Sequence, residues 1–178
     1  MKNLKLTVLS LAFIAFAASC SKKDHYTENS VSNVSNTTSA KVSADSTGWQ
    51  SVSQWQLIKQ DNNSVYYFNI ADKKFTSEVA SDGLVLVFKK NAGSMVALPS
   101  EETIGNVSSY WYHQVTVGNL LILSDVHNST NEPGAENYFK YVVITPDQLK
   151  SLETQGYTRS SLMNLTFDQA KKLFGFND

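Results

Sequence analysis

Four consecutive residues near the middle of the chain, Tyr110, Trp111, Tyr112 and His113, have side chains suited to binding a ligand. Successive side chains of a β-strand point to opposite faces, so Tyr110 and Tyr112 share one face and Trp111 and His113 share the other. We expect one pair to pack in the core and the other to form a platform on which a sugar ring or a partner protein stacks. The alternative is that both pairs only pack, since aromatic side chains are common in strands.

The residues that could bind a metal ion do not form a known motif. His25 lies in a polar segment near the N-terminus, and His127 follows Asp125 by two residues. Glu132 and Glu136 lie further along the same polar stretch. An Asp-x-His pair with nearby carboxylates could hold a metal, but catalytic zinc needs three well-placed protein ligands. We therefore expect no metal site.

Catalytic and cofactor motifs are also missing from the sequence. No serine lies in a Gly-x-Ser-x-Gly turn, and there is no Gly-x-Gly-x-x-Gly or Walker loop. Nothing in the sequence selects a pair of carboxylates for glycosidic cleavage among the candidates Glu78, Asp82, Glu101, Glu102 and Asp125. We expect a protein without catalytic residues or cofactor, and the alternative is a hydrolase of envelope or host glycans.

The single cysteine, Cys20, lies at the end of an N-terminal targeting segment. Two lysines precede an apolar run over residues 6–18, which is too short to span a bilayer but fits the central region of a signal peptide. Ala17-Ala18-Ser19-Cys20 resembles the lipobox of bacterial lipoproteins, with Ala17 where leucine is usual. The resemblance implies that residues 1–19 are a signal peptide and that Cys20 becomes the lipid-modified first residue of the mature protein.

Lipidation would account for an unpaired cysteine in an exported protein. Several acyl chains anchor a protein stably, because each buried CH₂ contributes about 0.8 kcal/mol. The alternative is an ordinary secretory signal with an incidental cysteine. Removal of residues 1–19 reduces the basic residues from 15 to 13, against 16 acidic ones. The expected partners are the membrane, through lipid on Cys20, and a glycan or protein ligand, but no nucleic acid, which requires a basic patch.

Residues 20–47 are expected to form the lipidated cysteine and a flexible tether. Of the 27 residues that follow Cys20, 14 are Ser, Thr or Asn, and such a segment buries too little apolar surface to offset the entropy of ordering. Ser21-Lys22-Lys23-Asp24 resembles the sorting signal that carries some Bacteroidetes-type lipoproteins to the outer face of the outer membrane. Asp45-Ser46-Thr47 resembles the acceptor triplet for O-glycosylation in those bacteria, which makes Ser46 a candidate modified residue.

Residues 48–178 are expected to form one mainly β domain, an antiparallel β-sandwich of about seven strands with two short C-terminal helices. The predicted strands share apolar, aromatic and β-branched composition and lie at Trp49–Leu57, Val65–Ile70, Leu84–Phe88, Met95–Leu98, Val107–Val117, Leu120–Val126 and Tyr138–Thr145. In the first of these, Trp49, Trp55 and Leu57 should share one face. The continuous apolar run Leu84–Phe88 should be buried on both faces, and Gly118-Asn119 suits a two-residue hairpin turn.

Two capping boxes predict the C-terminal helices. Thr145-Pro146-Asp147-Gln148 begins one helix and Thr166-Phe167-Asp168-Gln169 begins the other, with Gly156 and Gly175 beyond their ends. The last helix should present its apolar residues to the sheet, namely Phe167, Ala170, Leu173 and Phe174.

Several stretches resemble a β-sandwich module of uncharacterised Bacteroidetes cell-envelope lipoproteins, and the likeness covers most of residues 49–178. They are Asp82 to Phe88, Val-Ala-Leu-Pro at residues 96–99, Tyr138 to Ile144 and Leu165 to Phe174. The resemblance concerns strand patterns and the helical end, so it implies a fold and brings no catalytic residue. We therefore expect an outer-membrane lipoprotein on the cell surface that presents a non-catalytic binding or adhesion module. The alternatives are attachment at the periplasmic face and a structural role in the envelope.

Overall fold

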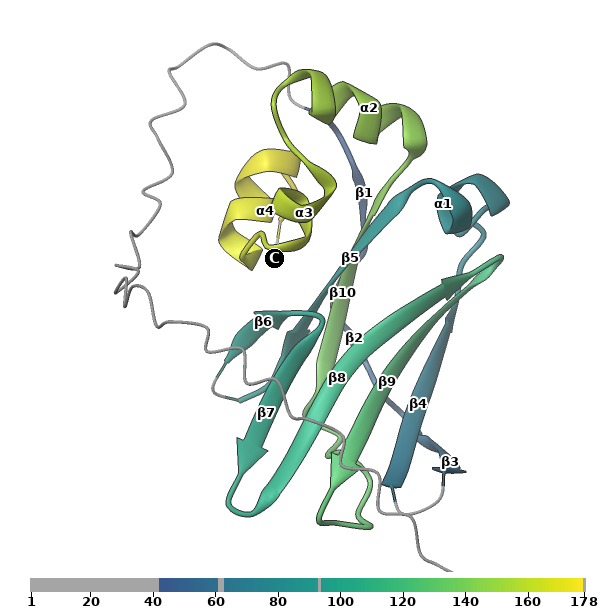
Figure 1. The fold of residues 1–178 in the computed structure, drawn as a ribbon, viewed down its shortest axis with the longest axis vertical. Helices are drawn as coiled ribbons and strands as arrows, with labels where there is room; N and C mark the ends of the chain where they lie inside the picture. The colour runs from purple at the N-terminus through teal and green to yellow at the C-terminus, as the bar shows by residue number, and fades with distance from the viewer. Residues whose placement is uncertain (1–41, 61–62, 93, 178) are drawn as a thin grey trace, which may run out of the picture. The chain divides into compact units, whose positions relative to one another are not determined.

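The computed structural model of the protein describes residues 42–60, 63–92 and 94–177 (Figure 1). In this part of the chain two antiparallel sheets pack face to face and short helices follow the last strand. The predicted fold class, a mainly β antiparallel sandwich with a helical end, is confirmed. The described residues form ten strands where about seven were expected. Asp45–Ser46 and Ser100–Ile104 also form strands, and the first expected strand is divided in two.

The first sheet, called sheet A, has the order β1-β10-β5-β6, and β2 also pairs with β10. Its strands are β1 (Asp45–Ser46), β2 (Gln50–Ser51), β5 (Leu84–Lys90), β6 (Met95–Ala97) and β10 (Tyr138–Ile144). Asp45 and Ser46 pair with Val143 and Val142. The sheet therefore begins upstream of residue 48, where the sequence placed the start of the domain.

The second sheet, called sheet B, has the order β3-β4-β9-β8-β7. Its strands are β3 (Gln56–Gln60), β4 (Asn63–Ala71), β7 (Ser100–Ile104), β8 (Val107–Thr116) and β9 (Asn119–His127). The β8–β9 hairpin pairs Thr116 with Asn119, so its two loop residues are Val117 and Gly118. The turn lies one residue earlier than expected, and Gly118 has a φ of 79°, which glycine adopts without a Cβ clash.

Four short helices are described, at Ser77–Ser81 (α1), Pro146–Thr154 (α2), Arg159–Met163 (α3) and Phe167–Phe174 (α4). The capping boxes expected at Thr145 and Thr166 are both present. A third box at Thr158 begins α3, so three helices rather than two follow β10. None of the described helices is long and apolar enough to cross a membrane.

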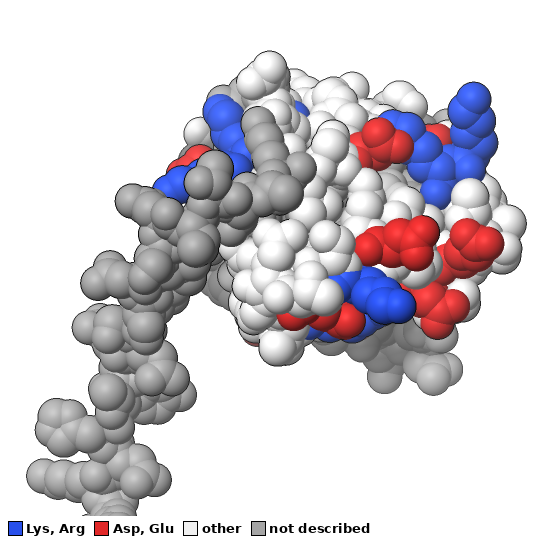
Figure 2. All heavy atoms as spheres, turned by 90° about the horizontal axis from the view of Figure 1, so that it is seen from above, with Lys and Arg blue, Asp and Glu red and all other residues white. Residues whose placement is uncertain are grey.

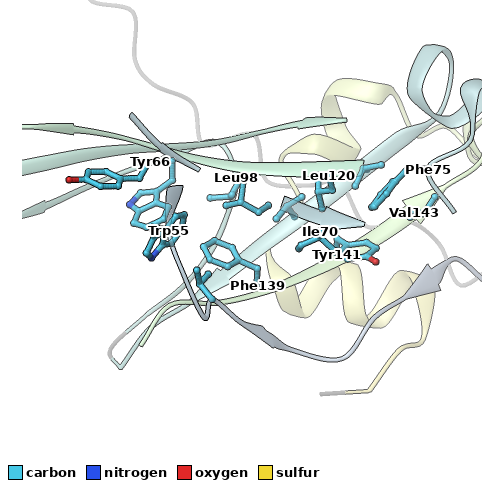
Figure 3. Close-up of a cluster of buried hydrophobic side chains, with 14 of the residues drawn as sticks. Trp55, Tyr66, Ile70, Phe75, Leu98, Leu120, Phe139, Tyr141 and Val143 are labelled. Carbon is cyan, nitrogen blue, oxygen red and sulfur yellow. The ribbon is translucent and has the colours of Figure 1, made fainter. Parts of the chain in front are cut away.

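The main core lies between the two sheets (Figure 3). Val85 and Val87 of β5 point into it, while Leu84, Leu86 and Phe88 point to the opposite side of sheet A. The predicted burial of this strand on both faces is therefore confirmed. It is possible because a different layer covers each side.

The C-terminal helices form the layer that covers the outer side of sheet A. Phe167 is the centre of this layer, with its ring centroid 5.4 Å from that of Trp49, 5.3 Å from Phe88 and 5.5 Å from Phe176. The predicted inner residues of α4 are confirmed, with Leu173 partly buried and the other three buried.

The face predicted for the first strand is wrong. Trp49 packs in the layer between sheet A and the helices, whereas Trp55 packs between the sheets and the side chain of Leu57 is 47% exposed. The chain leaves β2 after Ser51 and enters β3 at Gln56, and the irregular segment between them interrupts the alternation of faces.

Charges are mixed at the end of the sandwich where α1 and α2 lie (Figure 2). In this view acidic and basic side chains lie close to one another, and much of the visible described surface belongs to other residues. On the described part of this face the two signs are therefore mixed.

Replacing Phe167 by alanine should lower the free energy of unfolding by about 3–5 kcal/mol, because a buried aromatic ring with three aromatic neighbours is lost. Urea unfolding followed by circular dichroism measures the change. The control, Lys172→Ala, is exposed on the same helix and should change stability by less than about 0.5 kcal/mol. Equal stability of the Phe167→Ala variant and the unchanged protein would contradict the packing of the helical layer.

Candidate functional site

Strand β8 divides the four predicted platform residues between two faces of sheet B. Trp111 is 2% exposed and packs between the sheets, with its ring 5.8 Å from Trp55 and 5.9 Å from Phe139. His113 points the same way, and its Nε2–H donates to the carbonyl oxygen of Val85 at 3.1 Å. The two pairs lie on opposite faces of sheet B, as expected. Trp111 and His113 face the core, and Tyr110 and Tyr112 face outward.

The side chain of His113 is partly buried on the inner face of sheet B. Its Nδ1 atom is buried without a hydrogen-bond partner. Burial lowers the pKa of the ring below its ordinary value, and the bond to the Val85 carbonyl opposes this only in part. The imidazole is therefore held in its neutral form, with the proton on Nε2.

Tyr110 and Tyr112 form a stacked pair on the outer face of sheet B. Their ring centroids are 5.5 Å apart with 26° between the ring planes, and Tyr110 is 45% exposed. Burial and the carboxylate of Asp125 raise the pKa of Tyr112. Its hydroxyl therefore stays protonated over the physiological range and can donate a hydrogen bond.

A third tyrosine, Tyr67 of β4, lies on the same face and was missed in the sequence. Leu123 pairs with Tyr112 on one side and with Tyr67 on the other, so the two rings flank an aliphatic side chain. The hydroxyl of Tyr67 donates to Oε1 of Gln56. We call Tyr67, Tyr110 and Tyr112 the tyrosine platform.

A shallow open depression of about 300 Å³ adjoins the platform and shares Tyr67 with it. Its lining residues come from four strands and are Gln56, Tyr67, Asn69, Thr116, Asn119 and Leu121. Leu121 pairs with Asn69 on one side and Gln114 on the other, so an apolar side chain lies between amides. Nδ2 of Asn69 donates to Oδ1 of Asn119 at 3.0 Å, which orients both amides.

The charged groups of this face are acidic. Glu101 and Asp125 pair with Tyr110 from its two neighbouring strands, so their Cα atoms are roughly 10 Å apart, twice the strand spacing. Nε2 of His127 lies 3.6 Å from Oδ1 of Asp125. The strand register places no lysine or arginine among the described residues of this face.

The other carboxylates considered for chemistry lie elsewhere. Glu78 and Asp82 belong to α1 and its C-terminal end, and Glu102 points between the sheets, where it binds the ammonium group of Lys89. Of the five, Glu101 and Asp125 share the outer face of sheet B. In the described part of the chain no three or more His, Cys, Asp or Glu side chains are grouped so that they could hold a metal ion.

Further predictions concern the N-terminal part of the chain. Cys20, His25 and most of the predicted tether lie outside the described residues. Ser46 lies in β1 at the margin of sheet A and is half-buried. Its modification stays a prediction.

The chain matches no protein-family model, no curated protein and no solved structure. The resemblance to Bacteroidetes cell-envelope lipoproteins stays a prediction from the sequence.

The lowered pKa of the partly buried imidazole of His113 predicts a loss of stability in mild acid. The pKa is lowered in the folded protein, so between the folded value and about 6.5 the unfolded chain binds more protons. The neutral His113 side chain therefore contributes to the free energy of unfolding above a pH of about 6.5, and this contribution is lost as the pH falls below that value. Chemical unfolding at pH about 7.5 and about 5.5 should show this loss, and His113→Gln should show a smaller one.

His127→Gln is the matched control for this experiment. The His127 side chain is 42% exposed, so its replacement should leave the pH dependence close to that of the unchanged protein. If His113→Gln kept the full pH dependence, another group would be responsible.

Proposed function

We propose that this protein is an outer-membrane lipoprotein, anchored through lipid on Cys20, that presents the outer face of sheet B as a non-catalytic binding surface for a glycan or protein ligand. The observation that supports the binding role is the stacked pair Tyr110 and Tyr112 on a sheet face that none of the described helices covers. The anchor rests on the lipobox-like sequence that ends at Cys20.

The contrast between the two sheets supports this role. The helices bury the outer side of sheet A, as its apolar residues require. A solvent-facing side of an antiparallel sheet is usually polar, but the outer side of sheet B carries the tyrosine platform together with Leu121, Leu123 and Ile58. Exposed apolar side chains on this face, among them Tyr110 at 45% and Ile58 at 41%, are of the kind that interaction sites use.

Tyrosine suits such a surface for a physical reason. Its ring offers a large contact area with few rotatable bonds, so little conformational entropy is lost when a ligand binds. Stacking fixes Tyr110 against Tyr112 before any ligand arrives. This preorganisation lowers the cost of association.

The proposed anchor predicts the first residue and the modification of the mature protein. Its intact mass should correspond to a chain that begins at Cys20 and carries lipid, and Cys20→Ala should leave the precursor uncut or release the protein from membranes. Mass spectrometry of the native protein and membrane fractionation of the variant measure these results. A mature chain that begins elsewhere without lipid would contradict the anchor.

Digestion of intact cells tests on which face of the outer membrane the domain lies. Protease added to intact cells should remove the domain if it faces outward. Complete protection, with digestion only after lysis, would place the protein at the periplasmic face and favour a structural role in the envelope.

Substitution in the platform should weaken binding without loss of stability. Once a glycan array and a panel of host matrix proteins identify a ligand of about micromolar affinity, Tyr110→Ala and Tyr112→Ala should each lower that affinity by about tenfold or more. Tyr138→Ala is the matched control, because Tyr138 is 42% exposed but belongs to sheet A. Melting temperatures should stay close together. Equal binding by all three variants would contradict the platform.

A further inference from the structure

We infer that the binding surface takes a neutral oligosaccharide of at least two sugar rings and discriminates against acidic glycans. The inference rests on the proposed function and names the ligand class for the same face. Three features of the described residues carry it: the tyrosine platform, the amide-lined depression beside it, and the sign of the nearby charges.

The chemistry of the lining matches a sugar. A pyranose ring has an apolar face of C–H groups and an edge of hydroxyls, and each hydroxyl both donates and accepts hydrogen bonds. The rings of Tyr110 and Tyr112 can contact the apolar face of the sugar. Hydrogen-bond donors and acceptors for the hydroxyl edge come from the side chains of Gln56, Asn69, Asn119 and Thr116.

The arrangement of these groups sets the minimum length of the ligand. Leu123 is the direct cross-strand partner of Tyr112, so Leu121 is its diagonal neighbour, at about 7–8 Å on the same face. A sugar ring that lies on Tyr110 and Tyr112 cannot also fill the depression around Leu121. Contact with both places therefore requires a second ring, joined to the first across Leu123.

The depression alone is a weak site. Its volume of about 300 Å³ is at the lower end of the range for ligand pockets, and it is open to solvent. Monosaccharides should therefore bind poorly, and affinity should rise when both places are occupied.

The charges of the face select against anionic sugars. Glu101 and Asp125 lie on either side of Tyr110, and the register places no described lysine or arginine on this face. The basic group recorded beside these carboxylates is the imidazole of His127, 3.6 Å from Asp125. A uronate or sulfate stacked on Tyr110 would meet two like charges at close range. A neutral ring avoids this repulsion and can donate hydroxyl protons to both carboxylates.

A glycan array supplies the test with the full mature protein. The probes are gluco-, manno-, xylo- and N-acetylglucosamine oligosaccharides from the monosaccharide to the hexasaccharide, with oligogalacturonate, oligomannuronate and heparin fragments beside them. We expect at least one neutral series to bind, with its monosaccharide about tenfold weaker or more, and no binding of the acidic series. Tyr112→Ala and Asn69→Ala should each weaken binding of the neutral oligosaccharide.

A charge-neutralised variant tests the discrimination directly. The double variant Glu101→Gln with Asp125→Asn should lower the ratio of the affinity for neutral probes to that for acidic probes by about tenfold. The matched control, Glu78→Gln with Asp82→Asn, removes two exposed carboxylates at α1 and should leave the preference unchanged.

The outcomes separate this inference from the proposed function. An acidic glycan or a protein that binds through Tyr110 and Tyr112 would overturn the neutral-glycan inference and leave the binding surface in place. Neutral glycan binding that survives every platform substitution would overturn both. Release of reducing ends that stops in Glu101→Gln or Asp125→Asn would also overturn both, because the protein would then be a hydrolase.

Discussion

The packing of Trp111 between the two sheets is the interaction on which the outer surface of sheet B depends. Its ring lies against Trp55 and Phe139 in the core. Because side chains alternate along a strand, a slip of one residue would turn this ring into solvent and reverse every side chain of β8. Burial of the largest aromatic residue in the strand therefore fixes Tyr110 and Tyr112 on the opposite face.

A charge pair between buried Lys89 and partly buried Glu102 extends the same constraint to the edge of the sheet. The ammonium group of Lys89 lies 4.3 Å from the centre of the Trp111 ring and binds Glu102 of β7, which also accepts a hydrogen bond from Asn91 at 2.7 Å. Separation of this pair would leave a buried charge without compensation. It thereby holds Glu102 inward, and the alternation of faces then directs Glu101 outward beside Tyr110.

The sequence is informative where one strand or one helix contains the whole signal, and it fails where the signal is shared between distant segments. The alternation of side chains along a strand predicted which residues of β8 share a face. The capping boxes predicted where α2 and α4 begin. Strand β7 was missed because Ser100, Glu101 and Glu102 lack the apolar alternation of a strand, and their pairing with β8 and the bond to Lys89 supply what composition does not. Tyr67 and the depression were missed for a related reason, since they meet the platform only through the register of β4 with β9.

The shallowness of the site and the predicted lipid anchor are related under the proposed function. A binding face with three tyrosines and an open depression excludes water from only part of a ligand, so a single domain should bind with modest affinity. A lipid on Cys20 would hold many copies on one membrane, and a polymeric glycan presents repeated sites. Once one copy binds, the next binding event occurs at the high effective concentration that the shared surface sets, and overall avidity can exceed the single-site affinity by about 10²–10⁴. Anchoring would then supply the strength that the shallow surface lacks, while each single contact stays reversible.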